Sequence, residues 1–338
     1  MTRPASVTLQ DVAALAGVSI KTVSNVVREY QHVRPSTRAR VQDAIDRLGY
    51  VPHSIARRLA TGRTGMIAFA LPAIEAPYFA ELAALVSTEA DGFDYRLLIE
   101  QTAGSLEDER AVLRGRERGL IDGLIFQPTV LDAAAIEEFR GSTPLVLLGE
   151  IAAPPTVDHV MVDNTAAARA ATLHLLQSGR TRVAFLGQSA WTEHATTRLR
   201  MGGYRSALEE FGAFRDDDLL IPMTRFGAFS AEAAVVDAIE AGVRFDGLVC
   251  FDDLSAIGAM KALARTGRIV PDDVGVVGWD DILMAQFTNP GLTTIRPDKA
   301  ALVRTTFRML RERMDGASGP GRHELVGFDL VVRGSTAS

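Results

Sequence analysis

The sequence predicts an α/β protein, with a small all-α head at the N-terminus and a two-lobed core built on parallel sheets. Its 338 residues are too many for one simple core, so two or three domains are expected. Residues 8–49 carry helical patterns with recognisable caps and turns. From residue 65 onward, short apolar runs alternate with amphipathic helical stretches, which is typical of parallel strands covered on both faces.

Charge is distributed unevenly along the chain. Residues 1–63 contain ten Lys or Arg and four Asp or Glu, a net charge of +6, whereas the whole chain carries −6, so the remainder carries −12. A basic head on an acidic body favours an anionic partner for the head alone, with a solvated basic surface as the alternative.

The composition also bears on where the protein acts. The longest nearly apolar run, MIAFALPAI, is far shorter than the roughly 20 residues of a membrane span. The N-terminal residues lack the apolar stretch of a secretory signal, and Cys250 has no second cysteine with which to form a disulfide. We therefore expect a cytoplasmic protein without a membrane partner.

Two short helices are expected at the start of the head. Thr8 and Asp11 form a capping-box pattern that opens the first helix, whose apolar side holds Val12, Leu15 and Ala16. Gly17 ends this helix, and Ser19 is placed to cap a second helix from Ile20 to about Val27. Two helices joined by a short turn with a glycine are typical of a helix-turn-helix.

The second helix has one apolar edge and one polar edge. At 100° per residue, Val23, Val26 and Val27 fall together and are expected to pack on the first helix. With Ile20 at the border between the two edges, the opposite arc holds Lys21, Ser24, Asn25 and Arg28. Such donors read base edges and phosphates, so we favour DNA over an ordinary amphipathic helix with a solvated face.

A third helix and a short connecting segment follow. Pro35 opens the third helix, Val41, Ala44, Ile45 and Leu48 give it an apolar stripe, and Gly49 ends it. Residues 53–59 have room for barely two helical turns, which are too short to be stable alone. This segment is either a helix that forms against a partner or a plain linker.

The core alternates between expected strands and expected helices. The strands are the apolar runs MIAFALP, YRLLIEQ, GLIFQ, PLVLLG, HVMVD, RVAFLG, GLVCF and VGVVGW, and the helices are expected at 79–90, 105–118, 165–178, 203–211, 230–241, 254–265 and 299–314. Ligands of open α/β sheets bind at the carboxyl ends of the strands. That rule selects residues 72–79, Gln127, Glu150, residues 187–194, Asp252 and Asp280.

The sequence does not predict an enzyme. It contains no GxxxxGK[ST], GxSxG, HExxH or CxxC motif. The pairs Asp252-Asp253 and Asp280-Asp281 invite an acid–base interpretation. We instead expect Asp253 to cap a helix that begins at Leu254, and the other carboxylates to accept hydrogen bonds at strand ends. We predict no metal site and no cofactor.

The head and the following segment resemble the LacI/GalR family of bacterial transcription regulators. The stretches that carry the resemblance are VTLQDVAALAGVSIKTVSNVV and STRARVQDAIDRLGYVPHSIARRLATGRT. The resemblance implies major-groove contacts from Ile20, Lys21 and Asn25, and a minor-groove wedge at Leu59. It implies phosphate contacts from Thr8, Ser19, Ser24, Arg28, His32 and Thr37.

The head departs from the family pattern at two positions. Asn25 stands where the family more often has Arg, so a contact to guanine is expected to be replaced by one to adenine. Arg34 stands where a helix-capping Ser is usual.

The core resembles the same family, whose core shares the fold of periplasmic sugar-binding proteins. The matching stretches are APYFAEL, RLRMGGY, CFDDLSAIGAMKAL and VGVVGWDD. The resemblance implies a polar clamp on a small effector from Arg200 and Asp280, with Asp252 as a further acceptor. It implies Phe229 as an aromatic platform and Tyr78 and Phe79 from the opposite lobe, with core packing as the alternative for Phe229. Gln127, Glu150 and His194 complete the expected effector set, and Trp191 is expected with His194 at the mouth of the site.

The domain boundaries follow from these assignments. We expect the DNA-binding head at 1–52, a hinge helix and linker at 53–64, and the effector-binding and dimerisation core at 65–338. The first lobe is expected at 65–162 and 293–322, and the second at 163–292 and 323–338.

The resemblance implies a homodimeric repressor that binds a pseudo-palindromic double-stranded DNA operator and responds to a small molecule. A sugar or sugar derivative is the expected effector, and a purine or nucleoside is the alternative. From other classes, a sugar-binding transport component and a sugar-processing enzyme are the rivals. The basic head and the missing signal argue against the transport component.

Overall fold

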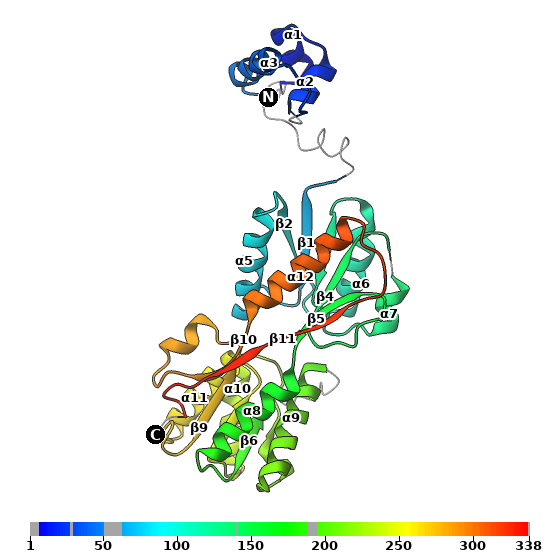
Figure 1. The fold of residues 1–338 in the computed structure, drawn as a ribbon. Helices are drawn as coiled ribbons and strands as arrows, with labels where there is room; N and C mark the ends of the chain where they lie inside the picture. The colour runs from blue at the N-terminus through cyan, green and yellow to red at the C-terminus, as the bar shows by residue number, and fades with distance from the viewer. Residues whose placement is uncertain (1–6, 28–29, 51–62, 140, 188–194, 337–338) are drawn as a thin grey trace. The chain divides into compact units, whose positions relative to one another are not determined.

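A computed structural model describes residues 7–27, 30–50, 63–139, 141–187 and 195–336. The chain divides into two compact units, Met1–Gly65 and Met66–Ser338, each of which is described by itself (Figure 1). Several expectations lie outside the described residues: the hinge segment from residue 53 to residue 62 with Leu59, the phosphate contact of Arg28, and the effector contacts of Trp191 and His194.

The first unit contains the helices α1 (Leu9–Ala16), α2 (Ile20–Val27) and α3 (Pro35–Leu48). The expected capping box is present: the Asp11 amide donates to Thr8 Oγ1 at 3.3 Å, and the Thr8 amide donates to Asp11 Oδ2 at 2.8 Å. Gly17 ends α1 in the left-handed conformation, with φ of 64°. Ser19 Oγ accepts from the Thr22 amide at 3.1 Å, which confirms Ser19 as the cap of α2.

The core of the head is small and almost entirely aliphatic. Its buried residues are Val12, Ala13, Ala16, Val23, Val26, Val41, Ala44 and Tyr50. The valine edge of α2 therefore packs inward as predicted. The prediction that Leu15 lies on the apolar side of α1 was wrong, because Leu15 is exposed. Ala13 is buried there instead.

The first lobe of the second unit is a fully parallel sheet with the strand order β11-β5-β4-β3-β1-β2. Its strands are β1 (Met66–Leu71), β2 (Arg96–Gln101), β3 (Gly123–Phe126), β4 (Leu145–Leu148), β5 (Asp158–Val162) and β11 (His323–Val326). Its helices are α5 (Pro77–Asp91), α6 (Leu106–Gly115), η1 (Arg116–Arg118), α7 (Ala133–Glu138) and α12 (Lys299–Met314).

The second lobe repeats this plan with the order β12-β10-β9-β8-β6-β7, in which β12 alone is antiparallel to its neighbour. Its strands are β6 (Val183–Leu186), β7 (Leu220–Ile221), β8 (Gly247–Cys250), β9 (Gly275–Trp279), β10 (Thr293–Pro297) and β12 (Phe328–Val331). Its helices are α8 (Asn164–Gln177), α9 (Ala195–Phe211), η2 (Asp217–Leu219), α10 (Ala228–Glu240), α11 (Asp253–Arg265) and η3 (Leu283–Phe287).

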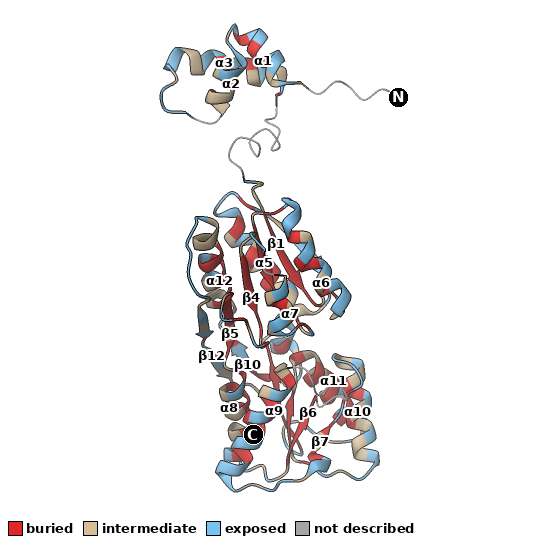
Figure 2. Ribbon diagram, turned by 90° about the vertical axis from the view of Figure 1, so that its right-hand side faces the viewer, coloured by how far each residue is buried: buried red, intermediate tan, exposed pale blue. Residues whose placement is uncertain are grey.

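The central strands of both sheets are buried between layers of helices (Figure 2). All eight apolar runs form strands, and all seven expected helices are present. The sequence patterns missed α7, the first half of α9, and the strands β7, β10, β11 and β12. Sequences such as TTIRP and HELV mix polar and apolar residues, so they lack the continuous apolar run that identified the other strands.

The chain crosses between the lobes after β5, after β10 and after β11. The expected lobe boundaries at 293 and 323 were wrong, because β10 pairs with β9 of the second lobe and β11 pairs with β5 of the first. The second and third crossings therefore fall near Asp298 and Gly327, and the Asp298 amide donates to the Gly327 carbonyl at 3.0 Å. This bond joins two of the three connections directly.

The C-terminal residues are part of the second lobe. Ser335 Oγ donates to the Val276 carbonyl at 2.6 Å and accepts from the Thr293 amide at 2.8 Å. Thr336 Oγ1 lies 2.8 Å from Thr293 Oγ1 and 2.8 Å from His174 Nε2. Both C-terminal residues are buried, so they connect β9, β10 and α8.

Among the described helices, none combines the length and the apolar character required to cross a bilayer.

Candidate functional site

The polar edge of α2 faces away from the core of the head. Ile20 is 48% exposed and Lys21 is exposed, whereas Val23 and Val26 are buried. Asn25 and Ser24 are half-buried at the border of the two edges. On the side opposite its packing face, the helix therefore carries side chains that can contact the edges of bases.

Three of the expected phosphate contacts, Thr8, Ser19 and Thr37, lie at helix starts. Thr8 and Ser19 are the N-caps of α1 and α2, and their hydroxyls bond to Asp11 and Thr22 respectively. Helix N-termini carry free amides and a positive partial charge, which suit a phosphate. His32 lies edge-on to Tyr30 at 5.3 Å between ring centroids, and Thr37 is half-buried in the first turn of α3.

Arg200 on α9 is the centre of a second cluster, which joins the two lobes. Only 7% of the residue is exposed. Its Nε donates to Asn164 Oδ1 at 2.8 Å, and its Nη1 donates to the Phe251 carbonyl. The guanidinium carbon lies 3.8 Å from the ring centroid of Trp279 and 4.7 Å from that of Phe251. These contacts fix the plane of the guanidinium.

Glu150 brings the first lobe to this cluster. It follows β4, and its Oε1 accepts from Asn164 Nδ2 at 2.9 Å while its Oε2 accepts from Thr196 Oγ1 at 2.7 Å. Asn164 and Thr196 both belong to helices of the second lobe. Because Asn164 also bonds to Arg200, it connects the carboxylate of one lobe to the guanidinium of the other.

Gln127 and Asp280 each have a side-chain acceptor that no described residue satisfies. Each residue is 8% exposed. Within the described part of the chain, Gln127 Oε1 has no hydrogen-bond partner, and no donor bonds to the carboxylate of Asp280. Burial raises the pKa of Asp280 well above its ordinary value, an effect that Arg200 opposes and that Asp253 and Asp252 strengthen.

Tyr78 and Phe79 meet the cluster from α5. Tyr78 packs against hydrophobic residues of both lobes and lies edge-on to Phe79, with ring centroids 5.3 Å apart. Burial raises the pKa of Tyr78 well above its usual value, and Asp280 and Glu150 add to that rise. The structure therefore brings together Tyr78, Glu150, Arg200 and Asp280 as the sequence predicted.

Phe229, the expected aromatic platform, is exposed, and another phenylalanine stacks beside the cluster. Phe229, in the first turn of α10, is 87% exposed. Phe226 instead stacks on Phe251, with ring centroids 4.2 Å apart and planes inclined by 22°. Because Phe251 also faces Arg200, the structure favours Phe226 over Phe229 as the platform.

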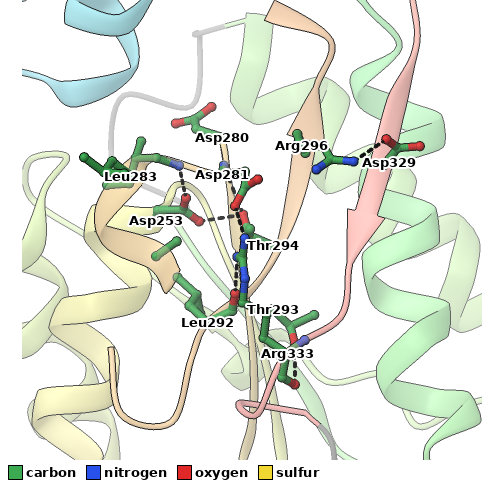
Figure 3. Close-up of polar contacts among 12 residues, drawn as sticks. Asp253, Asp280, Asp281, Leu283, Leu292, Thr293, Thr294, Arg296, Asp329 and Arg333 are labelled. Carbon is green, nitrogen blue, oxygen red and sulfur yellow. Dashed lines mark hydrogen bonds and ion pairs between the residues drawn. The ribbon is translucent and has the colours of Figure 1, made fainter. Parts of the chain in front are cut away.

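The two aspartates at the start of α11 have exchanged their expected roles. Asp252, not Asp253, caps the helix, and its Oδ1 accepts from the Ser255 amide at 2.6 Å. Asp253 is buried, and it accepts from Thr294 Oγ1 at 2.6 Å and from the Ile282 amide at 2.8 Å (Figure 3). Burial outweighs these hydrogen bonds and raises the pKa of Asp253 to about 7.

A second link between the lobes lies beside Asp280. Lys299 at the start of α12 forms an ion pair with Glu81 of α5, and it also donates to the carbonyl oxygens of Asp280 and Asp281 at 2.9 and 3.2 Å. Glu81 accepts from the Leu283 amide at 3.0 Å. The carboxylate of Asp281 pairs with Arg333 at 2.6 Å. These bonds hold the backbone that carries Asp280, whose φ is 105°.

Sequence reasoning missed Asn164, Phe226, Phe251, Trp279 and Lys299. Phe251 directly follows β8 and Asn164 is the second residue after β5, so the strand-end rule would have selected them. Trp279 is the last residue of an apolar strand, and nothing in the sequence separates it from the ordinary core.

Two family descriptions match the chain. Residues 8–53 match the bacterial regulatory proteins of the lacI family, and residues 172–336 match a periplasmic binding protein-like domain. The chain is also 30% identical over 333 residues to the HTH-type transcriptional repressor PurR of Photobacterium profundum, an alignment that covers 97% of this chain and 98% of the relative.

The chain belongs to the LacI family of bacterial regulatory proteins.

Solved structures of the LacI family agree with this assignment over nearly the full length. A Lac repressor dimer bound to operator and the anti-inducer ONPF is 26% identical, with a TM-score of 0.88, and the match covers 99% of this chain and all of that one. A complex of the regulator CelR with cellobiose is 27% identical, with a TM-score of 0.73, and the match covers 98% of this chain and all of that one. This LacI-family chain is a DNA-binding transcriptional regulator, and the named relatives are regulators rather than enzymes.

Proposed function

We propose that the protein is a cytoplasmic, homodimeric repressor whose operator affinity is set by a sugar or sugar derivative bound between the lobes. The observation that carries the proposal is the cluster around Arg200, in which buried acceptors of both lobes have no partner in the described protein. A ligand that donates hydroxyl groups to Gln127 and Asp280 would satisfy both lobes at once. We propose no catalytic role for these carboxylates.

On the DNA side, we assign base contacts to Ile20, Lys21 and Asn25. A single short helix reads only a few base pairs, so a two-fold dimer on a pseudo-palindromic site is needed for specificity. We assign phosphate contacts to Thr8, Ser19, Ser24, His32 and Thr37, and we retain Arg28 and Leu59 on the strength of the sequence resemblance.

An exposed apolar surface of the core supports the homodimer. Leu283, Met284 and Phe287 of η3 are each more than half exposed, and Leu98 and Ile99 are exposed on the edge strand β2. The bond between the Leu283 amide and Glu81 places η3 beside α5. Apolar patches and open strand edges of this kind are usually covered by a partner, and a second copy with two-fold symmetry is the simplest one.

The ligand would act by changing the balance between lobe arrangements. Glu150 and Glu81 of the first lobe bond to residues that move with the second lobe, so a ligand that contacts both lobes favours the arrangement in which these bonds form. Lobe closure then shifts the dimer interface and the hinge segments that lead to the heads.

A purine or nucleoside is the second candidate effector. The stacked pair Phe226 and Phe251, with Tyr78 nearby, would suit a flat base as well as the apolar face of a sugar. Hydrogen-bond donors on either class of ligand would fit Asp280 and Gln127.

The DNA-binding part is tested by selecting duplexes from a randomised pool with the intact protein. We expect a pseudo-palindromic sequence, and we expect Lys21→Ala to weaken binding to it by about 1–3 kcal/mol. Lys261→Ala is the matched control, because Lys261 pairs with Glu232 on the core surface at 2.8 Å. Selection of no preferred sequence, or equal losses in both variants, would contradict the proposal.

A further inference from the structure

We propose that the cluster around Arg200 selects its ligand by charge. It accepts an uncharged or amino-bearing ligand rich in hydrogen-bond donors and excludes phosphorylated and carboxylated ones. This inference rests on the proposed function, because it takes the cluster as the effector site.

The first argument is the charge balance of the cluster. The charged groups that act most strongly on Arg200 are Asp280, Glu150 and Asp252, so three carboxylates surround one guanidinium. Lys299, the other cation that acts on Asp280, is already paired with Glu81. Arg200 together with Asp280, Glu150 and Asp252 is therefore negative by two charges when all three carboxylates are ionised, and by one when Asp280 holds a proton. Asp253, which also acts on Asp280, adds a further negative charge when it is ionised. An anionic ligand would be repelled in a site where burial weakens screening.

The second argument is the occupancy of Arg200. An arginine grips a carboxylate or phosphate with two parallel N–H groups. Here Nε is engaged by Asn164 and Nη1 by the Phe251 carbonyl, and the guanidinium is stacked on Trp279. The fork that includes Nε is closed to a ligand. The N–H groups that remain, on Nη2 and Nη1, meet a ligand oxygen without the support of Nε.

The third argument is the kind of polar atom that remains open. The carboxylate of Asp280 and Gln127 Oε1 are acceptors, both in residues that are more than nine-tenths buried. In Figure 3 the carboxylate of Asp280 points away from the bonded network of Asp253 and Thr294. One oxygen of Asp252 is used to cap α11, which leaves the other as a further acceptor. Gln127 Oε1, Asp252 and an ionised Asp280 require donors, so hydroxyl and amino groups fit them where phosphate and carboxylate oxygens do not. A protonated Asp280 supplies one donor, and its other oxygen still accepts.

The test compares matched ligands on the intact protein by thermal unfolding and calorimetry. The uncharged and amino members are glucose, galactose, cellobiose, glucosamine and adenosine. The anionic members are glucose 6-phosphate, galactose 6-phosphate, glucuronate and adenosine monophosphate. We expect stabilisation only from members of the first group, and we expect Arg200→Ala to remove it.

A charge variant sharpens the test. Asp252→Asn removes one negative charge and keeps the helix cap, since Asn caps as well as Asp. We expect it to narrow the affinity ratio between the bound ligand and its phosphorylated counterpart by about tenfold. Asp132→Asn is the matched control, because Asp132 is an exposed N-cap of α7 outside this cluster.

The outcomes separate the two proposals. Binding confined to the anionic members, and lost in Arg200→Ala, would overturn charge selection while leaving an effector-binding regulator in place. An unchanged ratio in Asp252→Asn would also overturn charge selection. Stabilisation by no member of either group would count against the effector site itself and against the charge selection built on it.

Discussion

In the head, Ile20 and Lys21 lie exposed on α2, two or three residues from the buried Val23, whereas in the core Arg200 and Asp280 are more than nine-tenths buried. We propose that the exposed set meets a DNA duplex, a large partner for which only a rigid helix behind these side chains is needed. We propose that the buried set meets a small molecule. Arg200 of α9 and Asp280 after β9 come from separate segments of the second lobe, and Glu150 of the first lobe is connected to Arg200 through Asn164. We therefore expect a change in the buried set to alter both the stability of the core and the ligand response. A change in the exposed set should alter DNA binding alone.

The largest effect is expected from Arg200→Ala. The change leaves Asn164 Oδ1 and the Phe251 carbonyl without their donor and leaves three carboxylates without their cation. We expect a loss of about 3–5 kcal/mol in the free energy of unfolding of the core and no ligand response. Operator affinity of the ligand-free protein should persist, because the head is a separate unit. Chemical denaturation and DNA titration measure the two. Arg205→Ala on the exposed side of α9 is the control. A ligand response that is retained in Arg200→Ala would contradict the role of Arg200.

Two adjacent glycines of α9 offer the next comparison. A Cβ at Gly203 would lie 2.1 Å from the Thr165 carbonyl oxygen of α8, whereas a Cβ at Gly202 would meet nothing within 4 Å. We expect Gly203→Ala to cost about 1–3 kcal/mol through overpacking. Gly202→Ala should instead stabilise the helix by up to about 1 kcal/mol. Thermal unfolding of the two variants measures these changes in stability. Changes of the same sign in both variants would count against the close packing of α8 and α9.

The raised pKa of Asp253 predicts that the free energy of unfolding of the core depends on pH. Its pKa is about 7 in the folded protein against 3.8 for the ordinary carboxyl. Between about pH 4 and pH 7 the unfolded chain has lost this proton while the folded chain keeps it, so the free energy of unfolding falls as the pH rises. The slope from this group is at most about 1.4 kcal/mol per pH unit.

Asp253→Asn should make that fall shallower, whatever its effect on absolute stability. Denaturant titrations at several pH values measure the slope, with Asp237→Asn on an exposed position of α10 as the control. A slope identical to that of the unmodified protein would rule out Asp253 as its source.

The smallest effect is expected in the head. Thr8→Ala removes the capping box of α1 and should lower the stability of the head by about 1 kcal/mol, with the core unchanged. Thr88 offers a matched position in the interior of α5, where its hydroxyl bonds to the Ala84 carbonyl of the preceding turn. Thr88→Ala should be neutral or slightly stabilising, since Ala is the better helix former. Hydrogen exchange of the α1 amides should be faster in Thr8→Ala and unchanged in Thr88→Ala. Unchanged protection of α1 in Thr8→Ala would contradict the capping role of Thr8.

The head was more predictable from sequence than the core, for a physical reason. Thr8, Gly17, Ser19 and Gly49 act on residues at most a few positions away, so their caps and turns are written locally. Leu15 failed because a helix of eight residues has little room to define its apolar side.

In the core, strand ends predicted where acceptors such as Glu150 and Asp280 would lie, but not which atoms they meet. The bridge through Asn164, the ring pair with Phe251 and the exchange of roles between Asp252 and Asp253 depend on segments distant in sequence. No local pattern encodes those contacts. The strands β10 and β11 were missed for a related reason, since their pairing with β9 and β5 compensates for weak apolar patterns.

The buried tail at Ser335 and Thr336 has a consequence for synthesis on the ribosome. The first sheet lacks its edge strand until β11 has been made, and the second lacks β12 and the bonds to Val276 and Thr293 until the tail emerges. The head, by contrast, is complete once Tyr50 is available. At roughly 5–20 residues per second, the head can fold about 15–55 s before either lobe closes its sheet. A newly made chain therefore carries a finished DNA-binding head well before it has an effector site to control it.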